Sequence, residues 1–176
     1  AISVELASFG VTGITDMSPR NDPAIAAHFA AQHAAQHLRQ NIWLAGELSL
    51  AAAPPGRWQL GPAKLHLHEA ALPPFDDAVA FIAAAHAQSR AAAIHCVSEV
   101  EIVFALALLE HAGSVPGDRI EHASIASPEH IERMAELGLA VCVQPHFVAE
   151  RGDRYLLDVE PRLHGDLYRL RSLQEA

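Results

Sequence analysis

The feature that most constrains this chain is a strand–helix–strand pattern between residues 91 and 126. Two short apolar runs, residues 92–97 and 119–123, carry His95 and His122 respectively. Between them, residues 99–113 repeat apolar side chains at helical spacing. Such a unit makes its two strands parallel neighbours and puts both histidines at equivalent carboxyl-end positions. Open sheets and barrels of the α/β class place their chemistry at that edge.

The same alternation extends along the rest of the chain. Apolar or alternating runs predict further strands at residues 11–15, 41–49, 63–69 and 139–143. Helices are predicted at residues 4–9, 23–39, 76–90, 128–137 and 166–175. Residues 51–62, rich in proline and glycine, are expected to form a surface loop that sets specificity, and residues 147–165 are expected to be irregular. About six strands alternating with helices predict a parallel sheet or barrel.

Charge and composition exclude several classes of function. The formal net charge is −9 with 51% apolar residues, and no cluster of Lys and Arg stands out. We therefore expect neither a nucleic-acid nor a membrane partner, and a small-molecule substrate that is neutral or cationic. No run is long enough to span a membrane, and no signal peptide is evident. Cys96 and Cys142 lie in apolar runs and are expected to be buried, reduced thiols, which favours the cytoplasm.

Three side chains on successive predicted strands are candidates for chemistry: Lys64, His95 and His122. In a closed parallel barrel they would converge on one mouth. Imidazole nitrogens suit zinc, iron, nickel or copper, and a lysine joins them only when it is neutral or carboxylated. The alternative is structural: each histidine bonds a backbone carbonyl, and Lys64 pairs with Glu69 or Glu121. Their joint placement favours the metal hypothesis.

Other histidines are open to two interpretations. His33 and His37 lie four residues apart on the predicted helix 23–39, which allows a metal clip but favours a polar stripe facing solvent or a partner. In the strand 63–69, Lys64, His66 and His68 share one face, which is unusually polar for a buried strand. His66 and His68 have the spacing of a His-x-His ligand pair.

Several of these segments together resemble the amidohydrolase superfamily. They are Gly-Val-Thr-Gly-Ile-Thr-Asp at residues 10–16, Gly-Pro-Ala-Lys at 61–64, Ile-His at 94–95 and Arg-Ile-Glu-His-Ala at 119–123. Within the superfamily the chain resembles amidohydrolase family 3, the YtcJ-like metal-dependent hydrolases, which also have a triplet in the place of Val-Gln-Pro at 143–145. The resemblance covers nearly the whole chain.

The resemblance implies a parallel (β/α) barrel of the TIM type. At 176 residues the chain is shorter than the roughly 250 that a complete barrel needs. We therefore predict one partial barrel domain over residues 1–176, holding about strands two to seven and belonging to a longer protein. Open strand edges would favour association between copies of the chain.

The resemblance also implies a divalent metal, with zinc expected, held by Lys64, His95 and His122. The His-x-His pair of strand one and the aspartate of strand eight, which the family also uses, have no counterparts here, and His66 and His68 lie on the wrong strand for that pair. Gln144 and His146, just past the last strand, are expected to contact substrate or stabilise an oxyanion, and the alternative is a simple turn.

The implied reaction is hydrolysis of an amide or related C–N bond by a metal-activated water. No catalytic acid or base can be assigned from these residues. One alternative is a barrel fragment or pseudo-enzyme that binds a ligand or partner without catalysis. A second is an open, flavodoxin-like sheet, although no glycine-rich phosphate loop follows the first strand.

Overall fold

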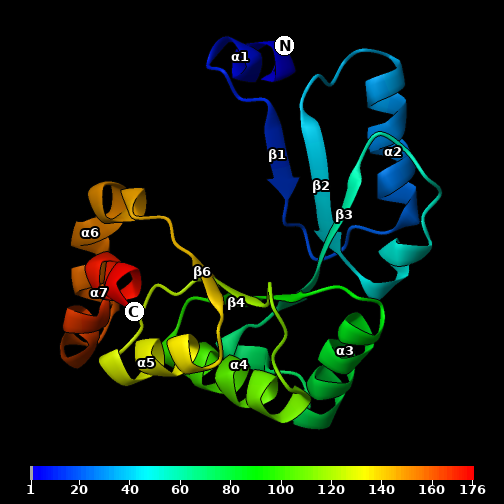
Figure 1. Ribbon diagram of the computed structural model, residues 1–176. Coiled ribbons are helices and arrows are strands. Elements are labelled where there is room, and N and C mark those ends of the chain that lie inside the picture. The colour runs from blue at the N-terminus through cyan, green and yellow to red at the C-terminus, as the bar shows by residue number, and fades with distance from the viewer. Residues whose placement is uncertain (1) are drawn as a thin grey trace. The chain divides into compact units, whose positions relative to one another are not determined.

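The computed structural model describes residues 2–176, and in this part of the chain six strands form one sheet in the sequential order β1-β2-β3-β4-β5-β6 (Figure 1). Their bounds are β1 Gly13–Asp16, β2 Asn41–Gly46, β3 Gln59–His66, β4 Ala92–Cys96, β5 Arg119–His122 and β6 Ala140–Cys142. The strands are parallel and alternate with helices. Sequential parallel order is the topology of a (β/α) barrel, so the predicted fold class, an incomplete TIM-type barrel, is confirmed.

Each predicted helix is present, and α6 is a further helix where irregular structure was expected. The α-helices are α1 Ile2–Ser8, α2 Pro23–Ala34, α3 Phe75–Ala87, α4 Glu99–Ala112, α5 Pro128–Glu136, α6 His146–Asp158 and α7 Leu170–Glu175. Short 3-10 helices are η1 Leu48–Ala52, η2 Glu69–Ala71 and η3 Pro161–Asp166. The chain divides into two compact units, the first running up to Leu65 with Ala84–Ala92, the second comprising His66–Ala83 and Ala93–Ala176.

The first unit has an apolar core between α2, η1 and β2. Four buried side chains form its centre, Ala26, Ile42, Leu44 and Leu50. Asp22 caps α2 by accepting a hydrogen bond from the Ile25 backbone nitrogen, and Pro23 occupies the first turn, where its missing N–H costs nothing. These signals place the helix start where the sequence predicts it.

The end of α2 differs from the prediction. The helix stops at Ala34 rather than near residue 39, because Gln36 takes a left-handed conformation with φ 58° that ends the helix. His37 therefore lies outside the helix, where its Nδ1 contacts Gln32 Oε1 at 3.2 Å. His33 is buried on α2 and the two imidazoles do not share a helix face, so neither the metal clip nor the favoured polar stripe is formed.

The predicted loop 51–62 is also shorter than expected. Residues 48–52 form η1, and β3 already begins at Gln59, so Gly61 and Pro62 lie within the strand. The β2–β3 register shifts between Leu44 and Gly46, and a Cβ on Gly61 would approach the Leu44 carbonyl oxygen to 3.0 Å. Glycine therefore permits the close backbone approach at this irregularity, and proline is tolerated beside it.

Arg90 ties the ends of β2 and β3 together. Its buried guanidinium donates hydrogen bonds to the carbonyl oxygens of Gly46 and Glu47 after β2 and of Gly61 and Pro62 in β3. Burial lowers the pKa of this arginine from its usual value, and the bonds to backbone oxygens satisfy its N–H groups. A single side chain thus connects the backbone at the end of β2 with the backbone of β3.

In the second unit, Glu101 organises the connection that follows β4. Ser98 caps α4 in a capping box with Glu101. The buried Glu101 carboxylate also accepts hydrogen bonds from the backbone nitrogens of Val97 at 2.6 Å and Glu69 at 2.8 Å. One carboxylate therefore fixes the residues immediately after His95.

Residues 147–165 were predicted to be irregular, and this prediction was wrong, because most of them are helical. Helix α6 occupies His146–Asp158, and Gly152 lies in its middle, which masked the pattern. Side chains four residues apart stabilise it: Arg154 pairs with Asp158, and the Arg151 guanidinium lies 4.7 Å from the centre of the Phe147 ring.

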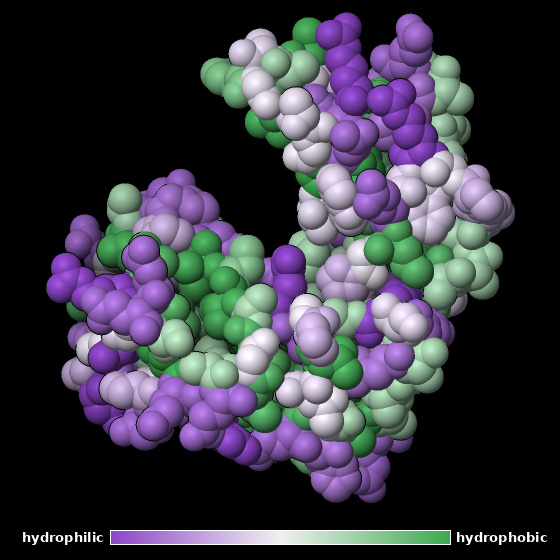
Figure 2. All heavy atoms as spheres, viewed as in Figure 1, coloured by the Kyte–Doolittle hydropathy of each residue, from purple (hydrophilic) through white to green (hydrophobic). Residues whose placement is uncertain are grey.

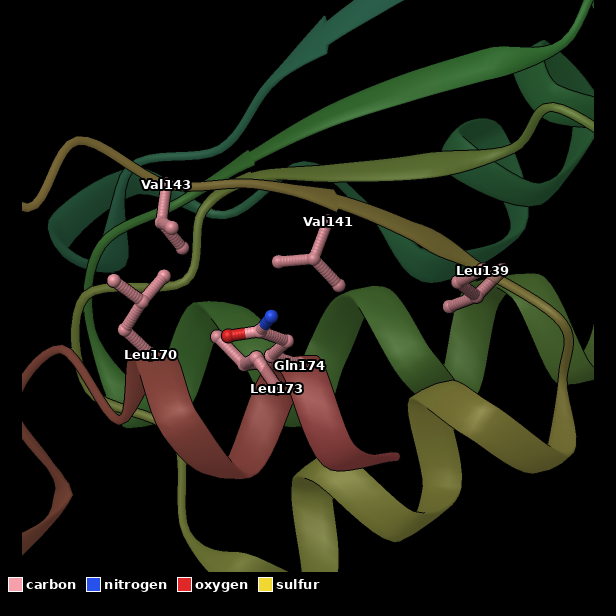
Figure 3. A pocket seen from close by; sticks show the side chains of 6 residues that line it. All are labelled: Leu139, Val141, Val143, Leu170, Leu173 and Gln174. Atoms are coloured by element: carbon pink, nitrogen blue, oxygen red, sulfur yellow. The ribbon is translucent and has the colours of Figure 1, made fainter.

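The two faces of β6 have different surroundings. Figure 3 shows Leu139, Val141 and Val143 pointing toward Leu170, Leu173 and Gln174 of α7, around a cavity of about 320 Å³. Figure 2 shows hydrophobic residues gathered in the same place, beside α7. Because side chains alternate along a strand, Cys142 and Gln144 point to the opposite face. Cys142 is exposed, so its predicted burial was wrong, while Cys96 is buried as expected.

We predict that Glu101→Gln lowers the free energy of unfolding by about 2–3 kcal/mol, because the neutral amide loses charge-assisted bonds to buried backbone N–H groups. Urea denaturation of the variant measures the change. Glu132→Gln, on the exposed face of α5, is the matched control and should leave stability unchanged. Equal stability of the two variants would show that Glu101 does not hold this connection.

Candidate metal centre

His95 and His122 come together, as the sequence predicts. His95 lies on β4 and His122 is the last residue of β5, the neighbouring strand. Their ring centroids are 4.4 Å apart and the ring planes meet at 71°. Both rings are partly exposed, so solvent reaches the pair. Two imidazoles at this separation can share one ion.

The backbone of His122 is what brings the pair together. In the parallel register His95 faces Glu121, whereas His122 faces Cys96. Strict alternation would therefore put the two imidazoles on opposite faces of the sheet. However, His122 has a φ of 74° and Ala123 a φ of 45°, both in the left-handed region. This turn rotates the His122 side chain to the His95 face, at an energetic cost that the surrounding structure must offset.

Gln144 contacts His122 directly. Its Oε1 lies 2.6 Å from His122 Nδ1, and the two residues come from the ends of β6 and β5. A carbonyl oxygen only accepts, so Nδ1 is the donor in this contact, and in a neutral ring Nε2 then keeps the lone pair. The structure thus connects Gln144, a predicted substrate residue, to a predicted metal ligand. His146 starts α6, is exposed, and packs beside Phe147 with ring centroids 4.5 Å apart.

Sequence reasoning missed the position of His66. Its ring stacks on His95 with centroids 4.2 Å apart and planes only 11° apart. Stacked rings direct their in-plane lone pairs along parallel lines, so His66 and His95 do not converge on one ion in this arrangement. The unusually polar face of β3, which carries both Lys64 and His66, was the signal that could have placed His66 here.

Lys64 belongs to the first unit. It lies on β3, is 6% exposed, and precedes His66 by two residues on the same strand face. In the second unit, Glu121 forms an ion pair with Arg119, and its carboxylate is buried.

Asp16 ends β1 in the first unit and is held in place by its neighbours. Its Oδ1 accepts hydrogen bonds from the Ser18 backbone nitrogen at 2.8 Å and from the Asn21 side chain at 3.0 Å. Burial alone would raise the pKa of Asp16, but these bonds outweigh it and lower that pKa. Asn21 also donates to the Ala45 carbonyl oxygen, which ties the ends of β1 and β2 together.

The residues present fit a divalent metal in part. Two neutral imidazoles on neighbouring strands are suitable donors, and the bond to Gln144 leaves Nε2 of His122 available. Within residues 2–176, however, no group of three or more His, Cys, Asp or Glu side chains is arranged to hold an ion.

Among the described residues, no helix is long and apolar enough to cross a membrane.

No curated protein matches the sequence significantly. Two solved structures share the fold, both described as uncharacterised metal-dependent hydrolases, from Pyrococcus furiosus and Pyrococcus horikoshii OT3. The first is 21% identical with a TM-score of 0.81, and 98% of this chain aligns with 42% of it. The second is 19% identical with a TM-score of 0.81, and 98% of this chain aligns with 41% of it.

The chain therefore spans about two fifths of the length of these structures. The family model for the amidohydrolase family matches residues 2–176, which include both histidines of the pair and Lys64. With nearly every residue inside this match, the chain belongs to the amidohydrolase family.

Proposed function

We propose that this chain is part of a metal-dependent hydrolase that cleaves an amide or related C–N bond in a small-molecule substrate. The observation that carries the proposal is the His95–His122 pair, at the ends of neighbouring parallel strands in a chain of the amidohydrolase family. The family supports hydrolysis as the reaction class. The bond, the metal and the substrate are parts of the proposal.

In this proposal His95 and His122 bind the metal through neutral imidazole nitrogens, and Lys64 joins them as a carbamate or a neutral amine. A bound divalent ion, which we propose is zinc, would supply Lewis-acid chemistry and lower the pKa of a water toward neutrality. The parallel strands hold the two imidazoles in place, and Glu101 fixes the backbone directly after His95.

The substrate side of the proposal rests on the residues after β6. His146 is exposed at the start of α6, and Gln144 lies beside His122, so both come from the segment next to the proposed metal site. The net charge of −9 favours a neutral or cationic substrate over an anionic one. We propose a cytoplasmic location, a reducing compartment in which thiols such as Cys96 and Cys142 stay outside disulfides.

A second candidate is a non-catalytic barrel that binds a ligand or partner. The observation in its favour is the incomplete set of His, Cys, Asp and Glu donors among residues 2–176. The two candidates differ in metal content, because only the hydrolase requires an ion for its function.

We predict that the full-length protein binds divalent metal stoichiometrically and that His122→Ala loses both the metal and hydrolytic activity. Metal analysis after dialysis and a panel of small amides measure the two effects. His37→Ala is the matched control, since this exposed histidine lies in the first unit, outside the proposed site. A metal-free parent protein would overturn the hydrolase proposal and favour the second candidate. This chain alone should bind metal weakly.

We also predict that this chain alone associates in solution. Strands β1 and β6 stand at the two ends of the sheet that the described residues form. Within this sheet each of them pairs with a neighbouring strand along one edge only. Unpaired strand edges are templates for pairing with another chain. Sedimentation velocity measures the effect, and a monodisperse monomer with a cooperative melt would contradict the prediction.

A further inference from the structure

We infer that Gln144 is a positioning residue for His122: it fixes the imidazole tautomer and helps to hold the left-handed backbone at the end of β5. The inference rests on the proposed function in one respect only, namely that His122 Nε2 is the atom offered to a metal. Positioning of His122, rather than direct contact with substrate, is then the main role of Gln144.

The first argument is geometric. In the parallel register Glu121 pairs with Cys142, and Gln144 follows two residues later on the same sheet face. This is also the face that carries His95, because His95 pairs with Glu121. The neighbouring residues Val141 and Val143 point to α7 on the opposite face (Figure 3). Strand alternation therefore directs Gln144 toward the imidazole pair.

The second argument is chemical. A neutral histidine has two tautomers, and only the one with the proton on Nδ1 donates to the Gln144 carbonyl oxygen at 2.6 Å. That tautomer leaves the Nε2 lone pair free to bind an ion. Partners of this kind orient metal-binding histidines, and their loss typically weakens metal affinity about 10–100-fold. A glutamine suits this role because its oxygen accepts without adding charge.

The third argument concerns strain. A non-glycine residue with positive φ is strained and persists only where surrounding contacts hold it. The segment after His122 is anchored by backbone bonds from Tyr168 to Ser124 and from Ala126 to Asp166. Those bonds fix the chain beyond the turn, but they do not orient the ring. The Gln144 bond supplies the ring orientation from β6.

The test compares Gln144→Met, which keeps the length of the side chain and removes the acceptor, with Gln144→Glu, which keeps an acceptor oxygen. Both are made in the full-length protein, and Gln174→Met on α7 is the matched control. The affinity of the metal-free proteins for zinc is measured by competition with a chromophoric chelator. Ring nitrogen chemical shifts of labelled His122 in the metal-free proteins report the tautomer.

We expect the Nδ1–H tautomer in the parent protein. Gln144→Met should give a mixed tautomer population and about 10–100-fold weaker zinc binding, whereas Gln144→Glu and Gln174→Met should stay close to the parent. An Nε2–H tautomer in the parent, or a tautomer unchanged in Gln144→Met, would overturn the inference. If the parent binds no zinc, the hydrolase proposal fails, while the ring shifts still decide the role of Gln144.

Discussion

The candidate site depends on the parallel register of β4, β5 and β6. This register aligns His95 with Glu121 and Glu121 with Cys142, so one face of the sheet carries polar or exposed side chains. The other face carries Ile94, Ile120 and Val141, of which the first two are completely buried. A shift of one residue would exchange the faces and place the apolar side chains at the proposed site. Burial of the apolar face therefore also fixes the side of the sheet on which His95 lies, and the left-handed turn brings His122 to the same side.

Much of this arrangement could be predicted from the sequence. Two apolar runs separated by a helical segment predict two parallel neighbouring strands. Parallel neighbouring strands put His95 and His122 at the same edge of the sheet. Local signals were equally informative, since Ser98 and Ser127 cap α4 and α5 and Gly113 follows the end of α4. These predictions succeeded because each depends on residues close in sequence or on a simple period.

The parts that could not be predicted depend on contacts between distant segments or on single backbone angles. The left-handed turn at His122 has no sequence signal, because histidine and alanine rarely adopt it. Gly152 concealed helix α6, although pairs four residues apart stabilise that helix. The exposure of Cys142 is not revealed by the apolar composition of its strand. The stacking of His66 on His95 likewise has no signal in the sequence.

Two imidazoles brought close together need separate means of orientation, because each ring can rotate about its side-chain bonds. For His95 the parallel stacking of His66 restricts the ring plane, and Glu101 fixes the backbone that follows it. For His122 the backbone is turned out of the strand pattern, so packing within β5 cannot determine the ring. The bond to Gln144 comes from a different strand and acts on a specific ring nitrogen. His122 is strained, and its ring is oriented by Gln144 at the end of the neighbouring strand. The tautomer of His122 therefore depends on how β5 pairs with β6. In this way the β5–β6 register affects the chemistry proposed for the site.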